Sequence, residues 1–328
     1  MTGGGWRYRV ATDRSRPGAV GVVDLLGKTA RLQEIGLPRV GSGLMVLADL
    51  WGVDRGLAVC WSEGLAQVMP HGGPAVVKAV VCELEARGVV RAGADDEALA
   101  ILYPEASDLI EARMLAALAE AQSPLAIDLL LRQPELWRAG GKSDPERDRV
   151  LARLIEPPLL AAVGPANIGK STLLNTLAGR SVAAVADEPG TTRDHVGLLL
   201  EVGGLTVRYV DTPGIREAEG VEAEAASIAA EVVAQADLVI ECLGECGTGG
   251  LSADAGCGAW GVGRGASVLR VGLRRDLGPP GGAVDIEVSA QTGEGIEELA
   301  GLIRERLVPD GVLESGTPWR FWSGVGSG

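Results

Sequence analysis

The stretch Gly164-Pro-Ala-Asn-Ile-Gly-Lys-Ser171 decides the fold of the second half of this 328-residue chain. It follows a short apolar run and opens a helical pattern, which is the setting that the phosphate-binding loop G-x-x-x-x-G-K-[ST] requires. Its glycines let backbone N–H groups curl round a β-phosphate, and the helix N-terminus adds the positive end of its dipole. A glycine-rich strand–helix turn with a chance lysine is the alternative, and the flanking patterns disfavour it.

Two side chains of this loop carry specific chemistry. Lys170 places a point charge against the β- and γ-phosphates of a nucleotide, and the hydroxyl of Ser171 can ligate Mg²⁺. We therefore expect a nucleotide to contact Gly164, Asn167, Ile168, Gly169, Lys170, Ser171 and Thr172.

Strand-like and helical runs alternate around the loop. Leu159–Val163 precedes it, the run at 172–177 is helical, and Gly203–Gly204 is typical of a hairpin turn. The other strand-like runs are 195–202, 205–211, 237–243, 267–273 and 284–288, and helical runs cover 221–235 and 295–307. This alternation predicts an α/β domain with a mostly parallel sheet, helices on its faces and one antiparallel edge strand.

Two further segments have the residues that a nucleotide-dependent switch requires. Asp211-Thr-Pro-Gly214 ends an apolar strand downstream of the loop, and this turn is a strong signal only because the loop precedes it. Asp211 can hold Mg²⁺ through water, and the N–H of Gly214 can meet a γ-phosphate. Between the two lies a segment, residues 189–194, that offers a threonine for Mg²⁺ and the γ-phosphate. Thr192 is the first candidate and Thr191 the second, so we expect Mg²⁺ on Ser171, Thr192 and Asp211.

A fourth segment, Ser289-Ala-Gln-Thr-Gly-Glu-Gly295, follows a strand and precedes a helix. Its backbone at Ser289 and Ala290 can recognise a guanine O6. Asp276 stands after the preceding strand-like run.

The rest of the chain divides into segments that differ in the spacing of their apolar residues. Residues 1–103 show short apolar runs between Gly and Pro and an amphipathic helix at 74–87, which predicts an α+β domain. Residues 104–156 form a helical connector, broken near Pro124 and at 139–145, and 157–308 form the P-loop domain. Residues 309–328 are expected to be a flexible tail, or one that docks through Trp319, Phe321 and Trp322.

Composition bounds the partners. The formal net charge is −14, which disfavours non-specific binding to nucleic acid, although a local basic patch can still dock an RNA. No run of 18 apolar residues occurs, so we expect a soluble, cytoplasmic protein without membrane partners.

The order GPANIGKS, PGTTRD, DTPG, SAQTGEG resembles the TrmE/Era/EngA class of GTPases, and within it the TrmE (MnmE) family of tRNA-modification GTPases. Asp211–Glu217 is similar to the DTAGxRE motif of that family, and Arg16–Val22 and His71–Val76 look like motifs of its N-terminal domain. The resemblance implies a P-loop GTPase that binds GTP and GDP.

The resemblance implies more about the mechanism. In that family the P-loop asparagine, here Asn167, ligates K⁺, and two P-loop domains dimerise across their switches, so we expect a homodimer. A glutamate after the DxxG motif orients the attacking water, and that position falls on Glu222, with Glu219 and Glu224 as competing neighbours. The alternative for Glu222 is a solvated carboxylate in the first turn of a helix. The expected catalytic set is therefore Lys170, Thr192 and Glu222.

The sequence departs from the family pattern at three places. Guanine specificity normally uses N-K-x-D, but here the stretch is Leu273-Arg274-Arg275-Asp276, which should weaken base discrimination by about 1–3 kcal/mol. Asp276 is retained and can accept hydrogen bonds from guanine N1 and N2. The family continues after the P-loop domain into a second helical half with a Cys-containing motif, whereas residues 309–328 contain no Cys, so we expect a shortened member. The folate-binding motif of the family is not recognisable near 91–103.

Three functions follow from these patterns. The first is a K⁺-stimulated GTPase, with a link to tRNA wobble-uridine modification. The second is a switch or scaffold that binds GTP, hydrolyses it slowly and controls a partner protein. The third, which depends only on Leu273 and Arg274, is an NTPase with relaxed base specificity.

Overall fold

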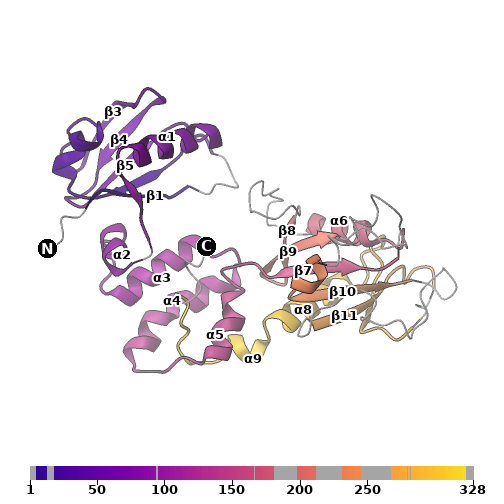
Figure 1. Cartoon of the computed structure of the whole chain (residues 1–328). Helices are drawn as coiled ribbons and strands as arrows, with labels where there is room; N and C mark the ends of the chain where they lie inside the picture. The colour runs from indigo at the N-terminus through magenta and orange to yellow at the C-terminus, as the bar shows by residue number, and fades with distance from the viewer. Residues whose placement is uncertain are drawn as a thin grey trace. The chain divides into compact units, whose positions relative to one another are not determined.

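In the computed structural model the chain forms two compact units that divide between Ala116 and Ala117 (Figure 1). The structure describes residues 5–12, 18–93, 95–165, 167–180, 198–211, 231–244, 267–278, 280 and 282–322.

The first unit is built on a six-stranded sheet with the order β3-β4-β5-β2-β1-β6. Its neighbours pair antiparallel except β1 and β6, which pair parallel. The strands are β1 (Arg7–Val10), β2 (Val23–Leu26), β3 (Leu44–Leu50), β4 (Asp54–Cys60), β5 (Leu65–Met69) and β6 (Val90–Arg91). The α+β character expected of this half is therefore present.

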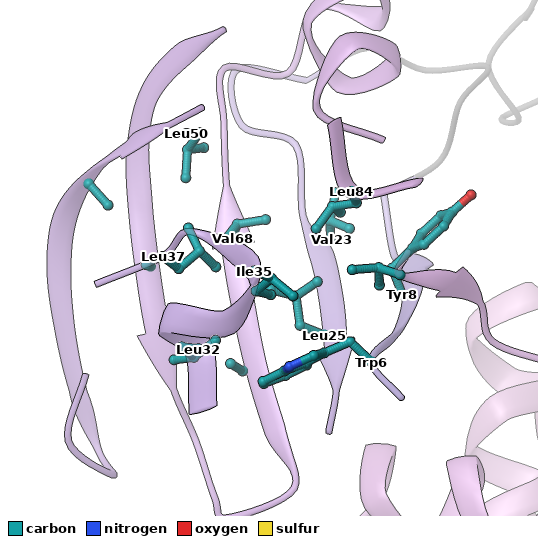
Figure 2. Close-up of a cluster of buried hydrophobic side chains, with 14 of the residues drawn as sticks. Trp6, Tyr8, Val23, Leu25, Leu32, Ile35, Leu37, Leu50, Val68 and Leu84 are labelled. Carbon is teal, nitrogen blue, oxygen red and sulfur yellow. The ribbon is translucent and has the colours of Figure 1, made fainter. Parts of the chain in front are cut away.

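One face of this sheet is covered by the 3-10 helix η1 (Thr29–Ile35) and the helix α1 (Pro74–Ala86). Figure 2 shows side chains of this core, among them Trp6, Ile35 and Leu84, gathered between strands and helices. The helix predicted at 74–87 is confirmed as α1, which begins with a proline at its first turn. Helix α2 (Asp96–Leu102) follows, and its N-cap Asp95 accepts from the Ala98 N–H at 2.9 Å. That backbone hydrogen bond lowers the pKa of Asp95.

Three helices make up the connector, α3 (Leu109–Glu120), α4 (Leu125–Arg138) and α5 (Pro145–Ala152). The gaps between them fall at the two predicted breaks. Pro124 stands immediately before α4, and residues 139–144 separate α4 from α5. The division between the units falls within α3, so α4 and α5 belong to the same compact unit as the P-loop domain.

The second unit contains a six-stranded sheet with the order β12-β11-β10-β7-β9-β8. All neighbours are parallel except β8 and β9, which form the hairpin at the sheet edge. The predicted fold class is confirmed. The strands are β7 (Leu159–Val163), β8 (Leu198–Val202), β9 (Leu205–Asp211), β10 (Leu238–Leu243), β11 (Ser267–Gly272) and β12 (Ile286–Glu287), and the helices α6 (Lys170–Arg180) and α8 (Ile296–Leu307) pack on them (Figure 1).

Residues 309–322 are docked rather than loose. The short helix α9 (Asp310–Leu313) leads into a segment whose Trp319 and Phe321 are buried. The buried guanidinium of Arg147 in α5 donates to backbone carbonyls of this segment, including Val312 and Thr317, each at 2.9 Å. Burial lowers the pKa of Arg147, while Asp148 and Asp144 oppose that shift. Residues 309–322 are therefore not the flexible tail that was one expectation, but the segment docked through its aromatic side chains that was the other.

Among the residues that the structure describes, no helix is long and apolar enough to cross a membrane.

Candidate functional site

The predicted site residues that the structure describes lie at one edge of the second sheet. Gly164 follows β7, Asp211 ends β9, Leu273 follows β11 and Ser289 comes shortly after β12. Because these strands run parallel, their carboxyl ends lie at the same edge, which is where open α/β sheets bind ligands.

The P-loop has a backbone that only certain residues can adopt. Gly164 has φ 148° and is buried, and a Cβ added to it would lie 2.6 Å from the backbone oxygen of Cys242 at the end of β10. Gly169 has φ 113°, and Asn167 has φ 63°, in the left-handed region that asparagine tolerates better than most residues. The glycine at 164 is therefore required by both its torsion angle and its close approach to β10.

Lys170 is the first residue of α6 and is only 7% exposed. Its Nζ donates to the carbonyl oxygens of Gly164 at 2.9 Å and Pro165 at 3.0 Å, so the ammonium lies against the loop that precedes it. Ser171 and Thr172 are exposed in the same first turn. The N-terminus of α6 and the Lys170 ammonium thus both carry positive charge at the P-loop, and this arrangement favours binding of a phosphate chain.

The loop at 273–276, which we call the base-recognition loop after the role expected from the sequence, begins with a buried apolar residue. Leu273 is 2% exposed, and its N–H donates to the Leu243 carbonyl at 2.8 Å. Its Cδ1 lies 3.7 Å from the position of a Cβ built on Gly169. The Leu273 side chain therefore lies next to Gly169 of the P-loop, at the position where the family pattern has an asparagine.

Arg274 links this loop to the P-loop. Its guanidinium donates to the Asn167 carbonyl at 2.7 Å, and Arg274 itself has φ 60°. A left-handed conformation costs a residue such as arginine about 1–2 kcal/mol, so the surrounding loop must hold it.

The last part of the site joins Asp276 to the segment after β12. The buried Ser289 Oγ donates to Asp276 Oδ1 at 2.6 Å and accepts the Thr292 N–H at 3.2 Å. The hydroxyl of Thr176, in α6, donates to the Ala290 carbonyl at 2.9 Å. These bonds hold the Asp276 carboxylate to Ser289 and the backbone of Ala290 to α6.

The structure brings together most of the sequence-predicted residues. Gly164, Asn167–Gly169, Asp276, Ser289 and Ala290 belong to loops at this edge, and Lys170–Thr172 form the first turn of α6. The register places Asp211 opposite Ala162, two residues before the P-loop. Thr191, Thr192, Gly214 and Glu222 lie outside the described residues.

Two contacts of the site were not anticipated from the sequence. The Arg274–Asn167 bond and the Thr176–Ala290 bond join loops far apart in the chain. Thr176 gives no sequence signal, because a threonine inside a helix is ordinary. Arg274 does give one, since it stands where the family pattern has a lysine that packs over the base.

Two groups implied by the family fit the residues present. Ser171 offers a hydroxyl at the start of α6 for Mg²⁺, which prefers oxygen ligands and substrate phosphates. Asn167 is exposed on the loop and offers an amide oxygen, a hard ligand suited to K⁺. Within the described part of the chain, no group of three or more His, Cys, Asp or Glu residues is placed to hold a metal ion.

Known proteins resemble this chain in both halves. A family model described as "50S ribosome-binding GTPase" matches residues 160–252. The tRNA modification GTPase MnmE of Acidiphilium cryptum is 32% identical over 309 residues, which cover 78% of this chain and 69% of that protein. The MnmE of Paracoccus denitrificans is 29% identical over 350 residues, which cover 88% of this chain and 80% of that protein.

Among solved structures, Era of Aquifex aeolicus bound to GDP·AlF₄⁻ has a TM-score of 0.37 and 24% identity, covering 45% of this chain and 56% of that chain. Alignments that cover 78% and 88% of this chain necessarily extend over both halves of it. The chain therefore belongs to the MnmE family of tRNA modification GTPases.

Proposed function

We propose that this chain binds GTP at the P-loop edge of its second sheet and hydrolyses it to GDP and phosphate. The observation that carries the proposal is the P-loop itself. The ammonium of Lys170 lies within 3.0 Å of two loop carbonyls at a helix N-terminus, and the Asp276 carboxylate accepts from Ser289 in the loops after β11 and β12.

The phosphate chemistry would consist of positioning and electrostatics. The backbone N–H groups at 167–172 would bind the phosphate chain, and Lys170 would hold charge at the β- and γ-phosphates. Asp276 would accept from the guanine N1 and N2 positions, while Ser289 and Ala290 present backbone to O6. Mg²⁺, when bound through Ser171, Thr192 and Asp211, would neutralise charge between the β- and γ-phosphates.

Membership of the family supports a finer version of this mechanism. Asn167 would ligate K⁺, two P-loop domains would dimerise, and Glu222 would orient the attacking water. K⁺ would supply positive charge beside the phosphates. We propose K⁺-stimulated turnover in a homodimer on these grounds, and the cytoplasmic location expected from the sequence stays a prediction.

The relatives that align over most of this chain are named tRNA modification GTPases. We therefore propose that tRNA, or a protein that acts on tRNA, is the partner of this chain. The net charge of −14 implies that such an RNA would be recognised locally rather than by the whole surface.

The decisive experiment is steady-state hydrolysis of GTP and of ATP by the purified chain, in K⁺ and in Na⁺ buffers. We expect GTP turnover that K⁺ raises well above its level in Na⁺. Tight GTP binding without turnover in either salt would refute hydrolysis and leave a nucleotide-dependent switch or scaffold. No binding of either nucleotide would refute the whole proposal.

A second candidate, an NTPase with relaxed base specificity, is favoured by one observation. Leu273 is buried where the family pattern has an asparagine, so the site would discriminate guanine from adenine with Asp276 and backbone only. ATP turnover within about tenfold of GTP turnover would support this candidate, because one polar contact contributes about 1–3 kcal/mol to discrimination.

A further inference from the structure

Strand β9 extends beyond its neighbour β7. The first residue of β7, Leu159, lies opposite Arg208, so Leu205, Thr206 and Val207 project past the start of β7. On the other side these residues remain paired with β8, Thr206 opposite Glu201. The projecting end of β9 therefore has to satisfy its outward polar groups with something other than β7.

The helical connector supplies those partners. The Thr206 N–H donates to Ser123 Oγ at 3.0 Å, and Thr206 Oγ1 donates to the Gln122 carbonyl at 2.8 Å. Ser123 and Thr206 are 1% and 2% exposed. Leu125, the first residue of α4, donates its N–H to the Gly204 carbonyl in the hairpin turn at 3.3 Å. The segment before α4 thus supplies hydrogen-bond partners to β9 beyond the start of β7.

A second anchor fixes the other end of the connector. Arg153, the C-cap of α5, donates to the Leu307 carbonyl at 2.8 Å and to Asp237 Oδ1 at 3.0 Å. The other carboxylate oxygen of Asp237 accepts the Leu159 N–H at 2.9 Å. The connector is therefore hydrogen-bonded to the P-loop domain at two separate places, through Ser123 and through Arg153.

The opposite end of β9 belongs to the candidate site. Asp211 lies five residues after Thr206 on the same strand, a span of about 16 Å at the usual rise of a strand. β9 is hydrogen-bonded to β7 on one side and β8 on the other, so it behaves as a stiff element between the two points.

We propose that the Ser123–Thr206 contact couples the nucleotide at the P-loop edge to the helical connector, with Thr206 as a positioning residue that acts through β9 on Asp211. The inference rests on the proposed function, because it needs GTP and GDP to displace Asp211 differently. By thermodynamic reciprocity, if GTP and GDP favour different arrangements of the connector, then a change in the connector alters the ratio of the two nucleotide affinities by the same factor.

The test is hydrogen exchange of the α4 backbone amides with GDP bound and with the non-hydrolysable analogue guanosine 5′-(β,γ-imido)triphosphate bound. Binding titrations of both nucleotides accompany it. In the unmodified chain we expect α4 exchange to differ between the two states. In Ser123→Ala we expect that difference to vanish, and the ratio of the two dissociation constants to move about fivefold.

Matched variants separate coupling from simple stabilisation. Gln122→Ala keeps both hydrogen bonds, because Gln122 contributes only its carbonyl, so it should behave as the unmodified chain. Ser123→Thr retains the hydroxyl and should restore the difference. If Ser123→Ala does not fold, Thr206→Val decides the question, since it removes one of the two bonds at nearly constant shape and should diminish the difference.

Three results would overturn the inference. The first is an α4 difference that survives in Ser123→Ala, and the second is one that Thr206→Val leaves unchanged. The third is the absence of any difference in the unmodified chain with both nucleotides bound. Failure of the unmodified chain to bind either nucleotide would instead be seen in the titrations, and it would overturn the proposed function together with this inference.

Discussion

The P-loop and the base-recognition loop lie at the same sheet edge, but they are built on different principles. The P-loop depends on backbone geometry, on Gly164 pressed against β10 and on one lysine, and its sequence matches the family pattern at every fixed position. The base-recognition loop depends on side chains, and two of them, Leu273 and Arg274, differ from that pattern. If the two loops bind phosphate and base as proposed, phosphate binding through backbone would tolerate little change, whereas base binding through separate side chains could lose one contact and keep the others.

The largest predicted effect is on the P-loop side of this comparison. Lys170→Ala removes the buried ammonium, and hydrogen bonds to charged groups contribute about 1.5–3 kcal/mol each, so GTP affinity should fall about 100-fold or more. Isothermal titration calorimetry measures it directly. Lys142→Ala, which removes the same charge from an exposed site, is the control. Retained micromolar binding in Lys170→Ala would refute the assignment of this loop.

The next effect tests whether the changed base loop still reads guanine. Asp276→Asn replaces an acceptor with a donor, so GTP binding should weaken about 10- to 100-fold, whereas xanthosine triphosphate, which has an oxygen in place of the guanine 2-amino group, should bind better. Competition against a fluorescent guanine nucleotide measures both affinities. ATP affinity should barely change, and Asp128→Asn on the exposed surface of α4 serves as the control. Equal losses for GTP and ATP would mean that Asp276 supports the fold and does not read the base.

Much of the fold could be predicted from periodicity. The strands at 159–163 and 205–211 and the helix at 295–307 are found within a residue of the predicted bounds, because apolar runs bounded by Gly and charged residues leave few alternatives. Helix α2 was missed, since its pattern of Asp-Glu-Ala-Leu-Ala is short, although Asp95 before it is a recognisable N-cap. The docking of residues 309–322 could not be derived, because it depends on long-range contacts such as Arg147 with Val312.

The parts of the candidate site that are contiguous in sequence could be predicted, and the contacts between separate segments could not. The P-loop residues are contiguous, so their spacing alone identified Lys170 and Ser171. The bonds from Arg274 to Asn167 and from Thr176 to Ala290 join separate segments, and one sequence does not reveal such pairs. The predicted roles of Thr192 and Glu222 stay predictions, because both residues lie outside the described part of the chain.

A smaller effect follows if Leu273 is returned to the family residue. Leu273→Asn introduces an amide next to the P-loop, where it can gain polar partners, so the preference for GTP over ATP should rise about 3- to 10-fold. The ratio of the two kcat/KM values measures the change. Leu273→Ala removes the same packing without adding an amide and should not raise that ratio. An unchanged ratio in Leu273→Asn would show that the backbone around this loop, rather than its side chain, limits discrimination.

The smallest predicted effect concerns the bond between the two loops. Arg274→Lys keeps the positive charge but replaces the planar guanidinium with an ammonium. The guanidinium can donate to the Asn167 carbonyl and still leave its flat face available to a base, whereas an ammonium has no such face. The Arg274 bond is exposed, so we expect only about a threefold loss of GTP affinity, shared equally with GDP. Arg275→Lys changes the neighbouring arginine, which pairs with Glu294 at 3.4 Å, and should have no effect. A loss tenfold or greater in Arg274→Lys would mean that the two loops are not independent, and that base recognition in this chain is held in place by the P-loop.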